Sequence, residues 1–489
     1  MKIIFNGHSF KYEIEAIIKL FIFTEHFEFI NDGELPSDSG EFIFSRLKKC
    51  RDNTYLYAVV NMNGLKIRKC FHFPNNTENY KNVCELELCR LIYTIIEKIT
   101  GISPSWGMLT GIRPVKRVSQ LMDSGMTDEE ICSFLDKKYN VSRKKSELAC
   151  MTANIQRPLL ENLDMKSVSL YISIPFCPTR CSYCSFVSHS MNTAAKLIPD
   201  YIRLLCHELE ILGDIVRKLG VHISTVYFGG GTPTSLSSTQ LEIIMKKTYE
   251  CFDLSAVTEY NIEAGRPDTI TEKKLMTIKN MGATRISINP QTFNDSVLET
   301  IGRHHTSEQT VSAFELARKC GFDNINMDLI AGLPSDSNES FNSSLDTAVN
   351  LNPDSITVHT LTVKRSANLF EQGIDTSNVC VSDMTDYAFN RLTENRYFPY
   401  YLYRQKNTVE NLENIGYARK SKESLYNIYI MDEIQTILGA GCAASTKLVS
   451  PSGKIKRIHN YKFPYEYVRN FDELMKKKND ILSFYREFF

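Results

Sequence analysis

Three cysteines lie close together in the segment 177–184, with three residues between the first pair and two between the second pair. They are Cys177, Cys181 and Cys184. A structural zinc ion takes four protein ligands, and an iron–sulfur cube held entirely by protein takes four thiolates. Three thiolates would leave one iron of such a cube open to a small ligand. The spacing predicts a 4Fe-4S cluster, and the alternatives are zinc with a distant fourth ligand such as His189, or three unrelated buried thiols.

A run of glycines and a carboxylate follow two later apolar segments. The run 229–234 reads Gly-Gly-Gly-Thr-Pro-Thr, and glycines at a strand end allow the backbone to approach a ligand closely. The Gly-Lys-Ser/Thr ending of a phosphate-binding loop is missing. Glu263 ends the next apolar segment, where a carboxylate is costly unless it meets a cation or hydroxyl groups. Both features predict ligand contacts.

Three further polar residues follow in the same region. Gln291 comes after the fourth apolar segment, Arg303 follows it, and Asp328 lies near the end of the fifth. Each residue alone could be an ordinary structural polar group. Together with the glycines and Glu263, they predict one rim of a site.

The elements that must position these residues are short apolar segments that alternate with longer helical stretches. The expected strands cover 170–174, 226–230, 260–264, 285–289, 324–330 and 356–361. Such alternation predicts parallel strands joined by right-handed crossovers, and six units are too few for a closed eight-stranded barrel. We therefore expect an α/β fold with a partial (β/α)6 barrel, whose chemistry lies at the carboxyl ends of the strands.

The sequence on either side of this region has a different rhythm. Residues 1–160 are expected to form an α+β accessory domain, with a hairpin at Asn63-Gly64 and helices over 85–99, 127–135 and 146–160. The barrel core is expected over 165–375. Residues 376–489 lose the regular alternation, and we expect them to form a C-terminal extension that covers the barrel.

Composition excludes several classes of protein. The 489 residues contain 57 Lys+Arg and 57 Asp+Glu, and this balance predicts no nucleic-acid partner. The 14 cysteines are too sparse for a disulfide scaffold, so we expect a reducing, cytoplasmic location. No uncharged apolar stretch of about 18 residues is present, and no membrane span or export signal is expected.

Residues from about 168 to 450 resemble the oxygen-independent coproporphyrinogen III oxidase (coproporphyrinogen dehydrogenase) group of the radical SAM superfamily. The resemblance rests on the order of several motifs. These are Tyr-Ile-Ser-Ile-Pro-Phe-Cys at 171–177, the cysteine triplet, Gly-Gly-Gly-Thr-Pro-Thr, Ile262-Glu263, Gln291, Arg303, Met-Asp-Leu-Ile at 327–330 and Leu-Asn-Pro-Asp at 351–354. The Gly-Ile-Arg-Pro segment at 111–114 is similar to the variant of the group that has an extra N-terminal domain.

The resemblance implies two cofactors, a 4Fe-4S cluster on the three cysteines and S-adenosyl-L-methionine (SAM). It implies SAM contacts from Tyr171, Gly230, Gly231, Thr232, Glu263, Gln291, Arg303 and Asp328. The implied reaction is oxidative decarboxylation of two propionates of coproporphyrinogen III to vinyl groups, which gives protoporphyrinogen IX. The implied partners are a tetrapyrrole substrate and a small electron-donor protein such as a flavodoxin or ferredoxin.

Two positions depart from the pattern of the group. Ser173 stands where a histidine is usual, and Phe186 stands where oxidases often have a cysteine. Phe186 is typical of the group's non-oxidase relatives. The alternatives are therefore a heme-binding chaperone or a radical SAM protein that methylates heme or opens its ring. Cations considered as partners for the substrate carboxylates are Arg113, Lys116, Arg365 and Arg404.

Overall fold

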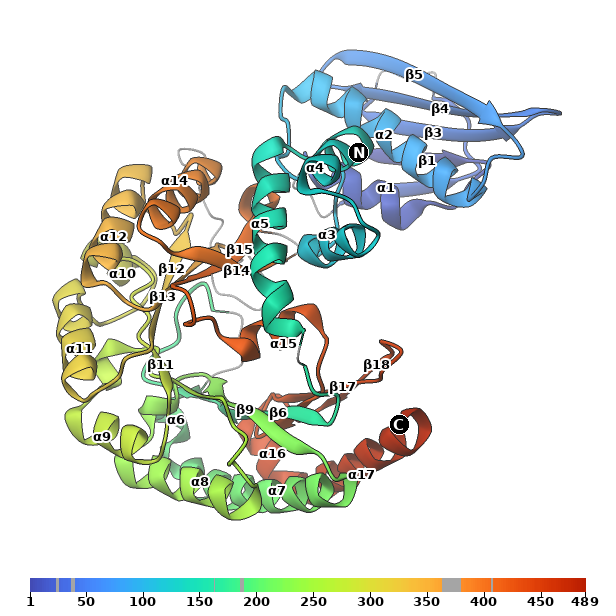
Figure 1. Ribbon diagram of the computed structural model, residues 1–489. Coiled ribbons are helices and arrows are strands. Elements are labelled where there is room, and N and C mark those ends of the chain that lie inside the picture. The colour runs from blue at the N-terminus through green and yellow to red at the C-terminus, as the bar shows by residue number, and fades with distance from the viewer. Residues whose placement is uncertain (23–25, 37–39, 162, 185–188, 363–379, 406–407) are drawn as a thin grey trace. The chain divides into compact units, whose positions relative to one another are not determined.

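The computed structural model describes residues 1–22, 26–36, 40–161, 163–184, 189–362, 380–405 and 408–489 (Figure 1). These residues form two compact units. The first contains Met1–Pro114, Gln120–Cys150 and Glu410–Leu412, and the second contains Val115–Ser119, Met151–Val409 and Glu413–Phe489. The boundaries expected near residues 160 and 375 stay predictions.

The first unit is built on a five-stranded sheet with the order β2-β1-β3-β4-β5. Its strands are β1 (Lys2–Asn6), β2 (Glu28–Asn31), β3 (Phe42–Lys49), β4 (Asn53–Met62) and β5 (Leu65–Pro74). Met62 pairs with Leu65, and the two residues between them, Asn63 and Gly64, have φ of 53° and 74°. This is the left-handed backbone that a two-residue hairpin turn requires, so the predicted hairpin is confirmed.

Helices cover one face of this sheet. The helices of the N-terminal region are α1 (Lys11–Ile18), α2 (Tyr80–Thr100), α3 (Pro114–Asp123), α4 (Asp128–Tyr139) and α5 (Arg143–Leu160). Apolar residues of α1 and α2 form one buried cluster with Leu56, Ala58 and Val60 of β4, so these two helices lie on one face of the sheet (Figure 1). The three helices expected in this region are found as α2, α4 and α5, although Thr127 is the N-cap of α4 and not its first helical residue.

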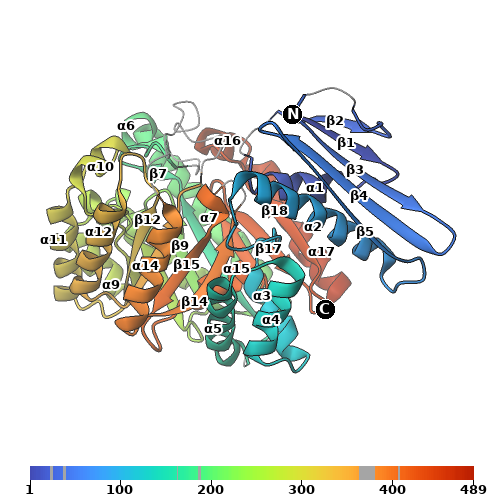
Figure 2. The same ribbon diagram turned by 90° about the horizontal axis from the view of Figure 1, so that it is seen from above.

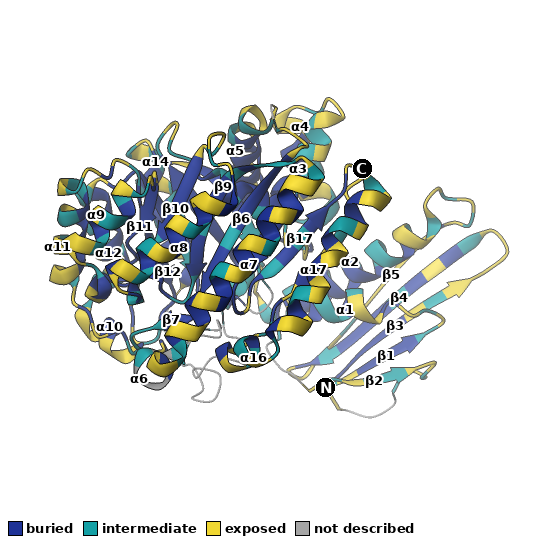
Figure 3. Ribbon diagram, turned by 90° about the horizontal axis from the view of Figure 1, so that it is seen from below, coloured by how far each residue is buried: buried dark blue, intermediate teal, exposed yellow. Residues whose placement is uncertain are grey.

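The second unit contains the predicted partial barrel. Six parallel strands follow one another in the order of the chain: β6 (Ser167–Ile174), β9 (His222–Gly230), β10 (Glu259–Glu263), β11 (Arg285–Ser287), β12 (Ile325–Ala331) and β13 (Ser355–Thr360). The helices between them include α7 (Ile198–Leu219), α8 (Ser238–Cys251), α9 (Glu272–Asn280), α10 (Asp295–Thr300), α11 (Ser307–Lys319) and α12 (Asn338–Leu351). Buried residues of the strands and exposed outer faces of α7 and α8 show that these helices form the outer layer (Figures 2 and 3). The (β/α)6 expectation is confirmed.

The sheet continues past these six strands at both edges. Beside β6 lie β16 (Ile437–Ala440), which is parallel to it, and the antiparallel strands β17 (Ser445–Val449) and β18 (Ile455–His459). Beside β13 lie the antiparallel strands β15 (Glu413–Ala418) and β14 (Phe398–Arg404). The other late elements are α14 (Val381–Glu394), α15 (Leu425–Asp432), α16 (Pro464–Arg469) and α17 (Phe471–Phe488). The C-terminal region therefore extends the barrel sheet itself.

A membrane-crossing helix would have to be long and apolar, and none of the described helices is both.

Candidate active site

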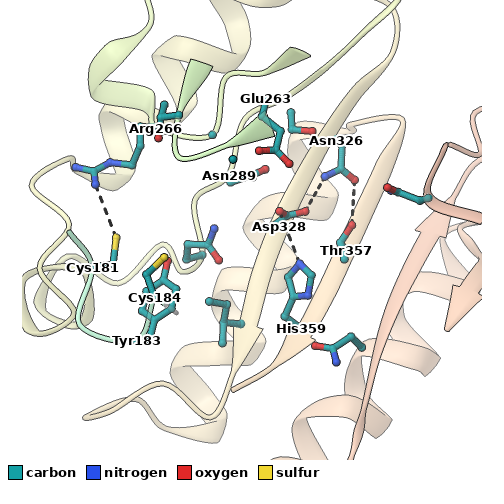
Figure 4. A pocket seen from close by; sticks show the side chains of 18 of the residues that line it. Cys181, Tyr183, Cys184, Glu263, Arg266, Asn289, Asn326, Asp328, Thr357 and His359 are labelled. Atoms are coloured by element: carbon teal, nitrogen blue, oxygen red, sulfur yellow. Dashed lines mark hydrogen bonds and ion pairs between the residues drawn. The ribbon is translucent and has the colours of Figure 1, made fainter. Parts of the chain in front are cut away.

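A cavity of about 390 Å³ lies in the second unit, within the size range of ligand sites (Figure 4). Most of the residues singled out in the sequence line it. These are Cys177, Cys181, Cys184, Gly230, Gly231, Thr232, Glu263, Gln291, Arg303 and Asp328. Parallel strands bring their carboxyl ends to one side of a sheet, which explains how residues far apart in sequence share one space.

The cysteine loop follows β6 directly. A short strand, β7 (Phe176–Cys177), pairs with β8 (His189–Ser190) and fixes the start of the loop. The amide of Ser182 donates to the carbonyl of Ile301 at 3.0 Å, which joins the loop to the end of α10. The Cys177 sulfur lies 3.5 Å from the Thr232 hydroxyl. These contacts hold the loop against the glycine segment.

The glycine segment is packed too tightly for larger residues. A Cβ on Gly231 would lie 2.7 Å from the Phe176 carbonyl oxygen and 3.0 Å from the Cys177 sulfur. Gly230 has φ of 109°, which residues with a side chain rarely adopt. Glycine is therefore required at both positions for the end of β9 to approach the cysteine loop.

Arg266 is a functional candidate that the sequence reasoning did not assign. It is buried, and its guanidinium donates to the Cys181 sulfur at 3.8 Å and to both carboxylate oxygens of Asp268 at 3.1 Å. A thiolate-bound iron–sulfur cluster carries negative charge, so a cation at this position fits such a group. The sequence could have indicated Arg266 by its position, three residues after Glu263 at the carboxyl end of β10.

Arg303 ties three segments of the rim together. Its guanidinium donates to the Tyr183 hydroxyl at 3.1 Å, to the Gly265 carbonyl at 2.8 Å and to the Asn289 carbonyl at 2.7 Å. Gln291 has an unusual positive φ of 69°, and backbone hydrogen bonds to β12 on both sides hold it there. The rim is thus fixed largely by its own polar contacts.

Asp328 lies in the middle of β12, and not near its end as the sequence suggested. Its carboxylate is 3.7 Å from the His359 imidazole, and Asn326 donates to it at 2.7 Å (Figure 4). Burial opposes its ionisation, but the hydrogen bond and charge of His359, together with hydrogen bonds from Asn326 and Thr357, lower the pKa of Asp328. Burial likewise opposes the charge on His359, but Asp328 raises the pKa of His359 above its ordinary value. A partly buried ion pair therefore lines the cavity, and its histidine was missed because it lies inside a strand and belongs to no motif noted in the sequence.

Glu263 accepts a hydrogen bond from the Tyr227 hydroxyl at 2.5 Å. Burial is the main reason that the pKa of Glu263 is raised to about 7; the nearby Asp328 raises it further, while Tyr227 and His359 lower it. Without a ligand, this carboxyl changes its charge near neutral pH.

The change of charge on Glu263 should be measurable both in the stability of the protein and in its infrared spectrum. Between the ordinary pKa of glutamate and pH 7, the folded chain holds a proton on Glu263 that the unfolded chain loses. The free energy of unfolding of the wild type, relative to Glu263→Gln, is therefore expected to fall as the pH rises from about 5 to 8. An infrared band of a protonated carboxyl should disappear with a midpoint near pH 7 and be absent from Glu263→Gln, but present in Asp328→Asn. A midpoint at the ordinary pKa of glutamate would contradict the prediction.

Tyr171 is the one predicted site residue that is not among the described residues lining the cavity. It lies on β6, with its ring 6.1 Å from the ring of Tyr227, which does line the cavity. Its contact with SAM stays a prediction.

None of the cations considered as partners for the substrate carboxylates is among the described residues that line the cavity. Arg404 does not line the cavity; it is buried on β14 opposite Glu413. Arg113 and Lys116 are likewise not among the lining residues. Arg365, like Phe186, lies outside the described residues. The cationic side chains on the cavity wall are instead Arg266, Arg285, Arg303 and His359.

A single-ion site is a poor description of the cysteine triplet. Thiolates on one tetrahedral zinc ion lie about 3.8 Å apart, given a Zn–S distance of about 2.3 Å. In the described part of the chain, no three His, Cys, Asp or Glu side chains are grouped closely enough to hold one metal ion. His189, the suggested fourth ligand, packs its ring against Phe463 and does not line the cavity.

Comparisons with known proteins agree with this site. Residues 171–348 match the radical SAM superfamily. The oxygen-independent coproporphyrinogen-III oxidase-like protein HemZ of Bacillus subtilis is 37% identical over 470 residues, which cover 94% of this chain and 93% of that protein. The heme chaperone HemW of Escherichia coli is 28% identical over 304 residues, which cover 62% of this chain and 76% of that protein. The solved structure of coproporphyrinogen III oxidase (HemN) from Escherichia coli has a TM-score of 0.51 and 24% identity, covering 66% of this chain and 73% of that one.

The barrel and its cysteine-lined cavity are those of a radical SAM protein. Proteins of this superfamily use a 4Fe-4S cluster and SAM, and these are the cofactors of this chain. Within the superfamily, the chain belongs to the family of oxygen-independent coproporphyrinogen-III oxidase-like proteins.

Proposed function

We propose that this protein is an oxygen-independent oxidase that converts coproporphyrinogen III to protoporphyrinogen IX. The observation that carries the proposal is the match to an oxidase-like relative over 94% of the chain. The cavity supports it, because the three cysteines and the polar rim share one space of ligand-site size.

In this proposal, Cys177, Cys181 and Cys184 hold the cluster. SAM is bound by the rim residues Tyr171, Gly230, Gly231, Thr232, Glu263, Gln291, Arg303 and Asp328. When bound, the two cofactors would supply the radical that takes a hydrogen atom from a propionate side chain, which would then release carbon dioxide and pass one electron to an external one-electron acceptor, leaving a vinyl group. A small electron-donor protein such as a flavodoxin or ferredoxin would supply the initial electron.

The chain's own residues would bind and orient the reactants. Arg266 places positive charge beside the Cys181 sulfur. The His359 imidazolium, paired with Asp328, lies on the side of the cavity away from the cysteines (Figure 4).

The test is an anaerobic reaction of the reconstituted protein with a reductant, SAM and coproporphyrinogen III. Mass spectrometry is expected to show protoporphyrinogen IX, in which two propionates of the substrate have become vinyl groups. A cluster-replete sample that cleaves SAM but leaves the tetrapyrrole unchanged would rule the oxidase out.

A second candidate is heme binding and delivery. It is favoured by the match to HemW of Bacillus subtilis, named a heme chaperone, which is 35% identical over 209 residues that cover 54% of that protein. In this case, the protein would bind heme stoichiometrically and transfer it unchanged. Heme that gains a methyl group, or whose ring opens, would instead indicate a heme-modifying enzyme.

A further inference from the structure

The segment 42–74, which forms β3, β4 and β5 of the first unit, has a strong local charge imbalance. It contains seven Lys and Arg residues and one Asp, although the whole chain is balanced at 57 of each sign. The seven are Arg46, Lys48, Lys49, Arg51, Lys66, Arg68 and Lys69, and all are exposed. None of these seven forms an ion pair with any carboxylate of the described residues. The overall balance therefore conceals a local surface of one sign.

Four of these cations lie on the sheet face opposite α1 and α2. Side chains alternate between the two faces of a strand, and Leu56, Ala58 and Val60 of β4 point toward the helices. Tyr55 and Tyr57 of β4 therefore point the other way. Their cross-strand partners share that face, and the cations on it are Arg46 and Lys48 of β3 and Lys66 and Arg68 of β5.

Aromatic rings lie between these cations. Lys48, Tyr55 and His72 form one cross-strand row, and Arg46, Tyr57 and Cys70 form the next. Tyr55 is 46% exposed and stacks on His72 with a ring distance of 5.6 Å. Tyr55 is thus an exposed ring beside Lys48, whereas Tyr57 is half-buried and packs edge-on against Phe44.

Like charges close together on a sheet destabilise it, and an ordinary solvated face mixes both signs. Single-stranded nucleic acids are bound by surfaces that combine cations for the phosphates with exposed rings on which bases stack. An acidic protein would use the cations but has no need of the rings. We propose that this face of β3, β4 and β5 binds single-stranded nucleic acid. The proposal does not depend on the function proposed for the barrel.

The test is fluorescence anisotropy of labelled 20-residue oligo-dT and oligo-U with the full-length protein. If the four cations of the face contact phosphates, the affinity should fall about 50-fold between 50 and 200 mM salt, which corresponds to a log–log slope of about −2.8. The double variant Lys48→Ala, Lys66→Ala should bind more weakly and reduce the slope by about 1.4. The matched control is Lys218→Ala, Lys420→Ala, which removes two exposed lysines of the second unit and should bind as the wild type does.

Tyr55 distinguishes nucleic acid from other polyanions without any change of charge. Tyr55→Leu should weaken oligonucleotide binding by about fivefold or more, while Tyr55→Phe should retain it, because the stacking ring is kept. A stronger affinity for oligo-U than for oligo-dT would identify RNA as the ligand, and the reverse would identify DNA. No binding at 50 mM salt would overturn the proposal. Binding that is insensitive to Tyr55→Leu and is displaced equally by polyglutamate would overturn it in favour of an acidic protein partner.

Discussion

Replacing Cys181 by serine is expected to remove the brown iron–sulfur absorbance and to abolish SAM cleavage. The reason is that an iron–sulfur cube already held by only three thiolates cannot lose another and keep its protein ligation. The buried position of Cys181, beside Arg266, leaves little room for another ligand to take its place. Iron content, the visible spectrum and electron paramagnetic resonance of the reduced protein measure the outcome.

The matched control is Cys206→Ser. Cys206 lies on α7, outside the residues that line the cavity, and burial raises the pKa of its thiol to about 11, which disfavours the thiolate form that a cluster needs. This variant should keep both the cluster and SAM cleavage. Normal iron content in Cys181→Ser would refute the assignment of that ligand, whatever the result for substrate turnover.

Local patterns in the sequence were sufficient for much of the fold. The Asn63-Gly64 turn and the six alternating strands each depend on residues close together in the chain, and both are confirmed. The two edges of the large sheet could not be predicted in this way. There, β16 pairs with β6 across more than 260 residues, and such pairings are decided by tertiary contacts that no short pattern records.

The residues of the candidate site also differ in whether local sequence patterns could reveal them. Residues that follow strands were found, because parallel strands bring their carboxyl ends together. His359 was missed because it lies inside β13, between Val358 and Thr360, in a segment that contains no motif. Asp328 was placed near the strand end, whereas the interior of β12 faces a polar cavity in which His359 and Asn326 satisfy its carboxylate. Only the three-dimensional pairing of these residues explains why the strand tolerates a charge.

Replacing Gly231 by alanine is expected to reduce iron content and SAM binding by at least about tenfold while leaving the protein folded. The added Cβ would lie 2.7 Å from the Phe176 carbonyl oxygen and 2.9 Å from its amide nitrogen, both backbone atoms that cannot turn aside. The cysteine loop would have to move away from β9, because the new Cβ would also lie 3.0 Å from the Cys177 sulfur. Iron analysis and equilibrium binding of SAM to the reconstituted variant measure the effect.

The control for this variant is Gly111→Ala, where a new Cβ would have no atom within 4 Å and the backbone is not left-handed. It should match the wild type in both measurements. If Gly231→Ala kept full iron content and lost only SAM binding, the glycine would serve the ligand and not the loop. If the variant kept both iron content and SAM binding, the site would form even with Cys177 displaced from its original position. The close packing of β9 against the cysteine loop would then have no role in forming the site.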